Sequence, residues 1–205
     1  MSITINFISK MDIFRLVTLG VVLATWLISI VYNTLAGRKR PPQSKEVKRE
    51  PASYWGIGLQ TISFFMMWFF FRPVLGPIVP MPAWLEVVVD IVAAALAILS
   101  LWLSIVAIRT LGAQWTYVAR VIEGHRLVTQ GPYRFARNPI YLGMLVWLLA
   151  SGLVWTRWWA FLLAIVLFLI GTKIRISREE KLLASTFGDE WLDYTRRVPA
   201  LFPGF

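Results

Sequence analysis

The sequence contains no cysteine, which excludes disulfides, iron–sulfur clusters and metal sites built on thiolates. It has a single histidine, His125, and one imidazole is too few for a zinc site of the usual His/Cys kind. Acidic residues are also scarce, with 11 Asp and Glu against 21 Lys and Arg, so the formal net charge is +10. We therefore expect a protein that works without a metal ion.

The excess of positive charge admits two kinds of partner, nucleic acid or a membrane surface. Charged residues make up only 16% of the chain, whereas 58% of its 205 residues are hydrophobic and 11 are Trp. This composition is too apolar for a soluble domain of this size, and Trp is enriched where membrane proteins meet the headgroups. We predict contact with membrane lipids and no nucleic-acid partner, because basic loops of membrane proteins face anionic headgroups.

Five apolar runs organise the chain, at about residues 13–35, 54–71, 84–108, 139–155 and 158–172. We expect all of them to be helices, because open strands leave unpaired backbone groups in lipid. Only Thr156 and Arg157 separate the last two runs, which predicts a tight helical hairpin over 139–172. Residues 1–12 lack the basic start and cleavage site of a signal peptide, so the first run is expected to be a retained span. The predicted fold is an all-α, polytopic transmembrane bundle of about five spans.

Basic residues are distributed unevenly between the two sides of such a bundle. The loop after the first run carries six Lys and Arg, the connection between the third and fourth runs carries five, and the C-terminal tail carries six. A chain of five spans puts these three segments on one side and leaves four basic residues on the other. Because cytoplasmic loops carry the excess of Lys and Arg, we predict an N-terminus outside the cell and a cytoplasmic C-terminus and active site.

The informative polar residues follow the third run. Asn138 and Pro139 predict the start of a helix, with Asn138 as its N-cap and Pro139 at the first helical position. The positive end of that helix lies beside Arg134 and Arg137, so an anion can bind there at low cost. Capping, together with arginines that extend toward the headgroups, explains the same residues without a ligand.

Arg175 and Glu179 lie four residues apart on the helix expected to continue from the fifth run, so they share a face. As a surface ion pair they contribute little. If they instead face a cavity between helices, each can hold a different ligand, since charge that points inward at a membrane boundary usually has a function. The sequence leaves both alternatives open.

Several short motifs stand in order across the C-terminal half of the chain. They are Gly124-His125-Arg126-Leu127-Val128, Gly131-Pro132-Tyr133, Arg137-Asn138-Pro139-Ile140-Tyr141, Arg175, Glu179-Glu180, Phe187-Gly188-Asp189-Glu190-Trp191, Tyr194 and Val198-Pro199. This series resembles the isoprenylcysteine carboxyl methyltransferase family of bacterial and archaeal type, which is itself similar to phospholipid methyltransferases. The resemblance covers roughly residues 111–203, whereas residues 1–110 resemble the family only as apolar spans.

The resemblance implies a membrane methyltransferase that uses S-adenosylmethionine, releases S-adenosylhomocysteine and has no Rossmann fold. The family's cofactor-contacting positions correspond to His125, Leu127, Val128, Tyr133, Asn138, Pro139, Tyr141 and Glu179. Arg175 corresponds to its substrate-side arginine and Arg137 to the arginine of its Arg-His-Pro motif, so both are predicted to be catalytic. Asn138 stands where the family usually has histidine, so this position lacks a group that titrates near neutral pH.

We expect residues 1–110 to form three transmembrane helices and a basic cytoplasmic loop. Residues 111–205 are expected to form the catalytic region, which includes the hairpin and a cytoplasmic C-terminal helix. The predicted reaction is methylation of a lipophilic or lipidated acceptor, with a carboxylate as the expected group. A carboxylate is already ionised, so it needs a cation and a dry site rather than a base, and the planar fork of arginine suits that task.

Other reactions are compatible with the same residues. Phospholipid N-methylation and S-methylation of a small thiol are alternatives within the methyltransferase class. Outside it, an NADPH-dependent reductase of a sterol-like lipid has a similar C-terminal region. A membrane protein without enzymatic activity is the remaining alternative, and it would bind no adenosine ligand.

Overall fold

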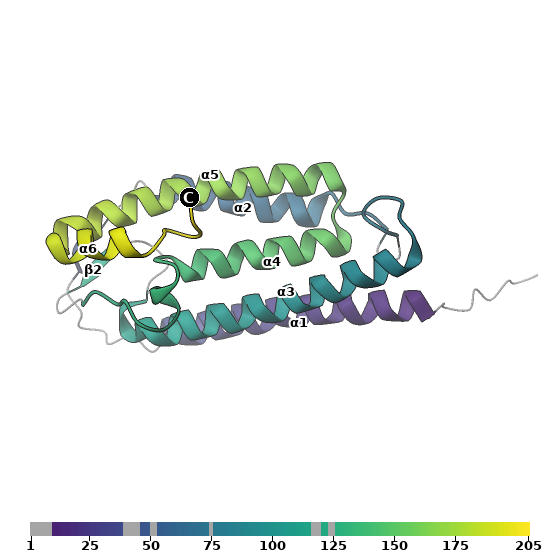
Figure 1. Ribbon diagram of the computed structural model, residues 1–205, viewed down its shortest axis with the longest axis horizontal. Coiled ribbons are helices and arrows are strands. Elements are labelled where there is room, and N and C mark those ends of the chain that lie inside the picture. Colours follow the sequence, from purple (N-terminus) through teal and green to yellow (C-terminus); the bar gives the residue numbers. More distant parts are fainter. Residues whose placement is uncertain (1–9, 39–45, 50–52, 74–75, 116–119, 123–125) are drawn as a thin grey trace, which may run out of the picture.

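The protein is described by a computed structural model that covers residues 10–38, 46–49, 53–73, 76–115, 120–122 and 126–205. Five long helices lie side by side in an elongated bundle (Figure 1). They are α1 (Lys10–Arg38), α2 (Ser53–Phe69), α3 (Ala83–Leu111), α4 (Pro139–Trp155) and α5 (Trp158–Phe187). A shorter helix, α6 (Asp189–Arg197), and two 3-10 turns, η1 (Gly112–Gln114) and η2 (Gly131–Arg134), complete the helical part.

The predicted all-α bundle is confirmed, and the chain is an integral membrane protein. Among the described residues, three helical segments are long and apolar enough to cross a membrane: Asp12–Gly37, Ala83–Leu111 and Trp158–Phe187. Helices α2 and α4 have 17 residues each, which is the lower end of the length that spans a hydrocarbon core. The number of spans therefore stays a prediction.

Two pairs of helices form the centre of the bundle, because α2 packs mainly on α5 and α3 mainly on α4. Glycine permits both close approaches. A Cβ on Gly56 of α2 would overlap Arg175 and the carbonyl of Gly171 in α5, and a Cβ on Gly143 of α4 would overlap the hydroxyl of Ser104 in α3. Small residues let membrane helices come this close, and here they set the distance of α5 from α2.

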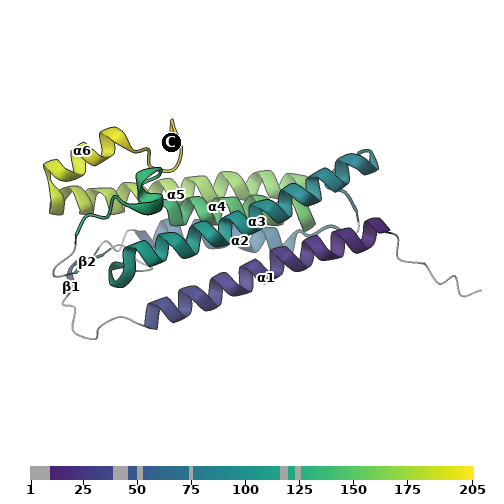
Figure 2. The same cartoon turned by 60° about the horizontal axis from the view of Figure 1, so that its bottom comes forward.

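Figure 2 shows α1 on the outside of the bundle, below α3, with its C-terminal end toward the end of the bundle that carries α6. The connections at that end also hold a feature that the sequence analysis treated only as loop. Strand β1 (Glu46–Arg49) pairs antiparallel with β2 (Arg120–Ile122), so the two basic connections are joined by a short ribbon. Backbone pairing between distant loops leaves no periodic signal in segments of three or four residues.

Helix α5 is longer than its apolar part. The apolar run was expected to end near residue 172, and the helix continues to Phe187, as the polar cluster after it predicted. Gly188, whose φ is +52°, ends α5 and reverses the chain into α6. This extension carries Arg175, Glu179 and Glu180 beyond the apolar part toward the connections.

Candidate functional site

A cavity of about 480 Å³ lies between α1, α3, α4 and α5 at the end of the bundle that carries α6. A volume of this size falls in the range of small-molecule pockets. Seven of the residues predicted from the sequence line it: Tyr133, Arg137, Asn138, Pro139, Tyr141, Arg175 and Glu179. The structure thus brings together side chains that are up to 46 positions apart in the sequence.

Arg175 points into the bundle and is only 8% exposed, so it does not reach out to the headgroups. Its Nη1 donates a hydrogen bond to Oε1 of Gln60 at 2.9 Å, and Nε2 of Gln60 donates to the hydroxyl of Thr172 at 2.8 Å. Its guanidinium also lies over the ring of Tyr141, 4.6 Å from the centroid. Helix α2 therefore holds Arg175 against α4 from behind, while the side chain still lines the cavity.

Glu179 faces the same cavity one turn further along α5. Its Oε1 lies 3.5 Å from Nη2 of Arg175 and accepts a hydrogen bond from the hydroxyl of Tyr141. The pair is therefore not the exposed surface pair that the sequence left open. The carboxylate presents acceptor oxygens to a ligand in the cavity.

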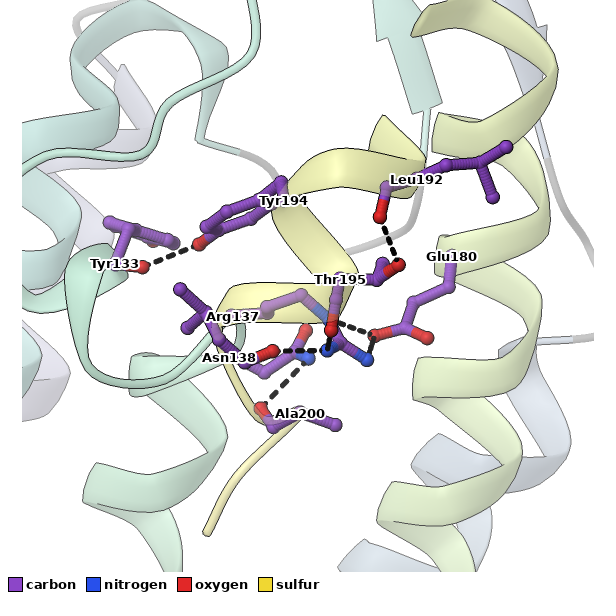
Figure 3. Close-up of polar contacts among 9 residues, drawn as sticks. Tyr133, Arg137, Asn138, Glu180, Leu192, Tyr194, Thr195 and Ala200 are labelled. Carbon is purple, nitrogen blue, oxygen red and sulfur yellow. Dashed lines mark hydrogen bonds and ion pairs between the residues drawn. The ribbon is translucent and has the colours of Figure 1, made fainter. Parts of the chain in front are cut away.

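Arg137 connects α4 to the C-terminal segment (Figure 3). Its Nε and Nη2 bind the carboxylate of Glu180 at 2.8 and 2.7 Å, and its Nη1 donates to the carbonyls of Thr195, at 3.3 Å, and Val198. A guanidinium with this many partners has little freedom, which fixes α6 beside the start of α4.

Asn138 directly precedes α4, and Pro139 is in its first turn, as predicted. Asn138 is the N-cap residue, as predicted, but its side chain makes no cap hydrogen bond. Its Nδ2 instead donates to the carbonyl of Ala200 at 3.1 Å, as does its backbone N–H at 3.0 Å. The C-terminal segment lies across the start of α4, and its carbonyl at Ala200 accepts hydrogen bonds from both amide groups of Asn138. No local pattern could predict this contact.

Tyr133 lines this end of the cavity, and Tyr194 of α6 binds its backbone. The hydroxyl of Tyr194 donates to the backbone carbonyl of Tyr133 at 2.5 Å, and both rings are buried. Burial raises the pKa of Tyr194 to about 12 and also raises the pKa of Tyr133. Both phenols are therefore neutral hydrogen-bonding groups over the physiological pH range.

The other half of the cavity is mainly apolar, with a few small polar residues of α1 and α3 among the lining. It is lined by Ile30 of α1 and Met144 of α4, and deeper by Trp26, Phe64 and Trp147. The polar and apolar halves meet near Tyr141, where the guanidinium of Arg175 is stacked. The cavity is therefore shaped for a ligand, or a pair of ligands, with one charged end and one lipophilic end.

Two of the predicted cofactor residues lie elsewhere. Leu127 packs against the cluster of Trp191, Tyr194 and Val198 behind α6, and it does not line the cavity; nor does Val128. His125 lies outside the described residues. Within the described ranges no group of three His, Asp or Glu side chains gathers to hold a metal ion.

The sequence analysis missed the residues that hold Arg175 and those that close the cavity. Gln60 and Thr172 belong to the first kind, and both are fully or nearly buried. A signal for Gln60 was present, because a lone amide inside the apolar run 54–71 requires a buried partner. Trp26 and Trp147 gave no such signal, since aromatic residues are common in every span.

The fold and the site define an integral membrane protein whose helices enclose a ligand-sized pocket with a charged end. The sequence profile of the phospholipid methyltransferase family matches residues 88–190. These residues are half of the chain, and the chain belongs to that family. The resemblance drawn from the motifs is confirmed by this match, which begins within α3 rather than after it.

Curated relatives are similar over slightly less than half of the chain. Protein-S-isoprenylcysteine O-methyltransferase B of Arabidopsis thaliana is 33% identical over 47% of this chain and 50% of its own length. The Schizosaccharomyces pombe protein-S-isoprenylcysteine O-methyltransferase is 36% identical over 40% of this chain and 34% of its own length. The cobalt-zinc-cadmium resistance protein CzcN of Cupriavidus metallidurans is 34% identical over 48% of this chain and 45% of its own length. The chain thus matches half or less of the length of these relatives.

Proposed function

We propose that the protein is an S-adenosylmethionine-dependent methyltransferase that esterifies the carboxylate of a lipophilic or lipidated acceptor. The observation that carries the proposal is the two-sided cavity, with Arg175 and Glu179 at one end and an apolar chamber of membrane-embedded side chains at the other. The similarity to protein-S-isoprenylcysteine O-methyltransferases supports the same reaction class.

The residues at the polar end fit the cofactor by their chemistry. Glu179 supplies a carboxylate for the hydroxyl or amino groups of the cofactor, and Tyr133 and Asn138 supply neutral polar groups beside it. Pro139 and Tyr141 line the wall next to them. The remaining members of the cofactor set implied by the resemblance, Leu127, Val128 and His125, stay predictions.

Arg175 is the cation that we assign to the acceptor carboxylate. It lies at the junction of the polar and apolar halves, and Gln60 and Tyr141 hold its planar group in one orientation. Arginine recognises a carboxylate through two parallel hydrogen bonds, so orientation counts as much as charge. Arg137 also lines the cavity, but Glu180 and two backbone carbonyls already bind it, so we assign it to positioning the C-terminal segment.

The reaction needs alignment more than acid–base chemistry. S-adenosylmethionine, when bound, supplies a methyl group on a positively charged sulfur. A carboxylate oxygen of the acceptor forms the new bond to the methyl carbon while the carbon–sulfur bond breaks and its electron pair stays on sulfur. The acceptor is ionised from the start, so no residue removes a proton. The role of Arg175 is to hold the oxygen in line, and that of the apolar walls is to keep water out.

We further propose that the cavity opens toward the cytoplasm, with residues 111–205 as the catalytic region and the N-terminus on the opposite side. The charge asymmetry of the connections supports this orientation. Reporter fusions check it: a fusion after Phe205 should report cytoplasm and a fusion after Gly76 the outside. A cytoplasmic signal at Gly76 would contradict the orientation.

The function itself is tested with the purified protein in detergent. Calorimetry should show binding of S-adenosylhomocysteine, and lipophilic carboxylic acids should accept a labelled methyl group from S-adenosylmethionine. Binding of NADPH in place of S-adenosylhomocysteine would favour a reductase. Failure of the protein to bind either S-adenosylhomocysteine or NADPH would contradict the enzymatic assignment.

A further inference from the structure

The deep end of the cavity is closed by one aromatic side chain from each of three helices: Trp26 of α1, Phe64 of α2 and Trp147 of α4. We call these three residues the aromatic floor. The ring centroids of Trp26 and Trp147 are 6.3 Å apart, and those of Phe64 and Trp147 are 5.8 Å apart. These are contact distances for aromatic pairs, so the floor is continuous from α1 to α2.

A second layer of rings supports the floor from behind. Trp68 lies 5.2 Å from Trp26, Trp155 lies 6.2 Å from Trp147, and Phe168 lies 5.9 Å from Phe64. These three rings are not among the described residues that line the cavity. Trp147 is also only 5% exposed, and its Nε1 donates to the carbonyl of Val22 at 3.4 Å. Trp155 and Phe168 are buried as well, so the rings behind Trp147 and Phe64 yield little to an intruding group, whereas Trp68 behind Trp26 is 40% exposed.

The floor lies close to the charged end of the cavity. Trp147 follows Tyr141 by six positions on α4, and Tyr141 is the residue over which Arg175 is stacked. At the rise of an α-helix this separation is about 9 Å along the axis. An extended chain anchored at Arg175 therefore meets the floor after a short distance.

We propose that the aromatic floor sets the greatest chain length of the acceptor, so that the site takes short lipophilic carboxylic acids and rejects long ones. The inference rests on the proposed function, because that function assigns the acceptor carboxylate to Arg175. An acid within the limit fills the apolar half of the cavity along Ile30 and Met144. An acid beyond it must displace rings that are packed on a second layer, and one surplus methylene in an apolar pocket changes discrimination by about tenfold or more.

The test measures binding, so that it does not depend on methyl transfer. A homologous series of linear saturated carboxylic acids displaces a fluorescent fatty acid from the full-length protein in detergent. Longer acids also partition into detergent, so the quantity compared at each length is the ratio of variant to wild-type affinity. For the wild type, affinity should rise with length to a maximum and then fall.

Two floor variants on different helices, Trp26→Ala and Phe64→Ala, should move the maximum to longer acids. Beyond the wild-type maximum the affinity ratio should rise about tenfold or more, and below it the ratio should stay near one. The matched control is Trp68→Ala, which removes the ring behind Trp26 without opening the cavity and should leave the maximum in place. Trp26→Phe and Phe64→Leu remove less volume and should give smaller shifts in the same direction, even if an alanine variant fails to fold.

An identical length profile in the wild type and in the floor variants would overturn the proposal, as would a wild-type affinity that rises through the longest acid. Methyl transfer is measured separately with the same acids. The expected length profile without any methylated product would overturn the proposed function and leave the role of the floor intact. Methyl transfer with a length profile that no floor variant changes would overturn the role of the floor and leave the proposed function intact.

Discussion

The two ends of the bundle carry the same kinds of charge and use them differently. The end with the cavity, here the site end, has two arginines and two glutamates: Arg137, Arg175, Glu179 and Glu180. The opposite end, here the far end, has two arginines and two carboxylates: Arg15, Arg72, Glu86 and Asp90. Both sets are largely buried, and both join residues from distant parts of the sequence.

The difference lies in the space that each set encloses. At the far end Arg15 binds Glu86, with Asp90 3.8 Å away, and Arg72 donates to the carbonyls of Leu153 and Thr156. The space enclosed there is only about 10 Å³, enough for a water molecule at most. At the site end the charges border about 480 Å³. Buried charge alone therefore does not mark a ligand site in this protein; charge beside an open volume does.

The largest effect is expected at Arg175. Arg175→Ala should lower kcat/KM for methyl transfer by about 10³-fold, because one positioned charged donor is lost from the reacting centre. Arg175→Lys keeps the charge but cannot bridge Gln60 and Glu179, so we expect a fall of about 10²-fold from misplacement. Affinity for S-adenosylhomocysteine, measured by calorimetry, should change little in the lysine variant.

The far end supplies the control for Arg175. Arg72→Lys should leave kcat/KM near the wild-type value, because the hydrogen-bond partners of Arg72 in the described part of the chain are backbone carbonyls. If Arg175→Lys left kcat/KM as little changed as Arg72→Lys, the guanidinium of Arg175 would have no part in the reaction.

The next effect concerns stability at the far end. Glu86→Ala leaves Arg15 without its closest partner, and breaking a buried ion pair from one side costs about 3 kcal/mol. Thermal unfolding in detergent should show the loss, while affinity for S-adenosylhomocysteine in the folded protein should not change. Weakened ligand binding at an unchanged unfolding temperature would mean that the far end is also part of a ligand site.

Glu179 is the corresponding test at the site end. Glu179→Gln should weaken binding of S-adenosylhomocysteine by about 1.5–3 kcal/mol, the usual effect of losing a hydrogen bond to a charged group. Calorimetry measures it directly. Glu180→Gln is the matched comparison: Glu180 binds Arg137 and does not line the cavity, so this variant should affect stability more than affinity.

The smallest effect concerns the contact between α2 and α5. Gly56→Ala places a methyl group against Arg175 and Gly171, and overpacking of this kind costs about 1–3 kcal/mol. It should lower both the unfolding temperature and kcat/KM, since Arg175 must shift. Gly58→Ala, on the same helix with open space around it, should be neutral in both measurements. Equal behaviour of the two variants would show that the close approach does not position Arg175.

Some of these features followed from the sequence alone. Apolar runs of the right length predicted the helices, because a chain in lipid must satisfy its backbone internally. The helical start at Pro139 and the helical continuation through Arg175 and Glu179 are local properties of a few consecutive residues. The motif series predicted the family, and seven of its residues border one cavity. All of these inferences depend on short-range patterns, which a single sequence contains.

Only the tertiary structure decided which charged residues face a cavity and which form ion pairs with no ligand-sized space beside them. Arg175 and Arg15 each lie three or four residues from a carboxylate along a helix, and this local spacing does not tell which of the two arginines lines a cavity. Gln60 reaches Arg175 across 115 positions because two glycines let α2 and α5 touch. The side chain of the N-cap Asn138 binds a carbonyl 62 positions away instead of the backbone of its own helix. Such contacts arise from how whole helices pack, and the packing energy is shared among residues that no local pattern connects.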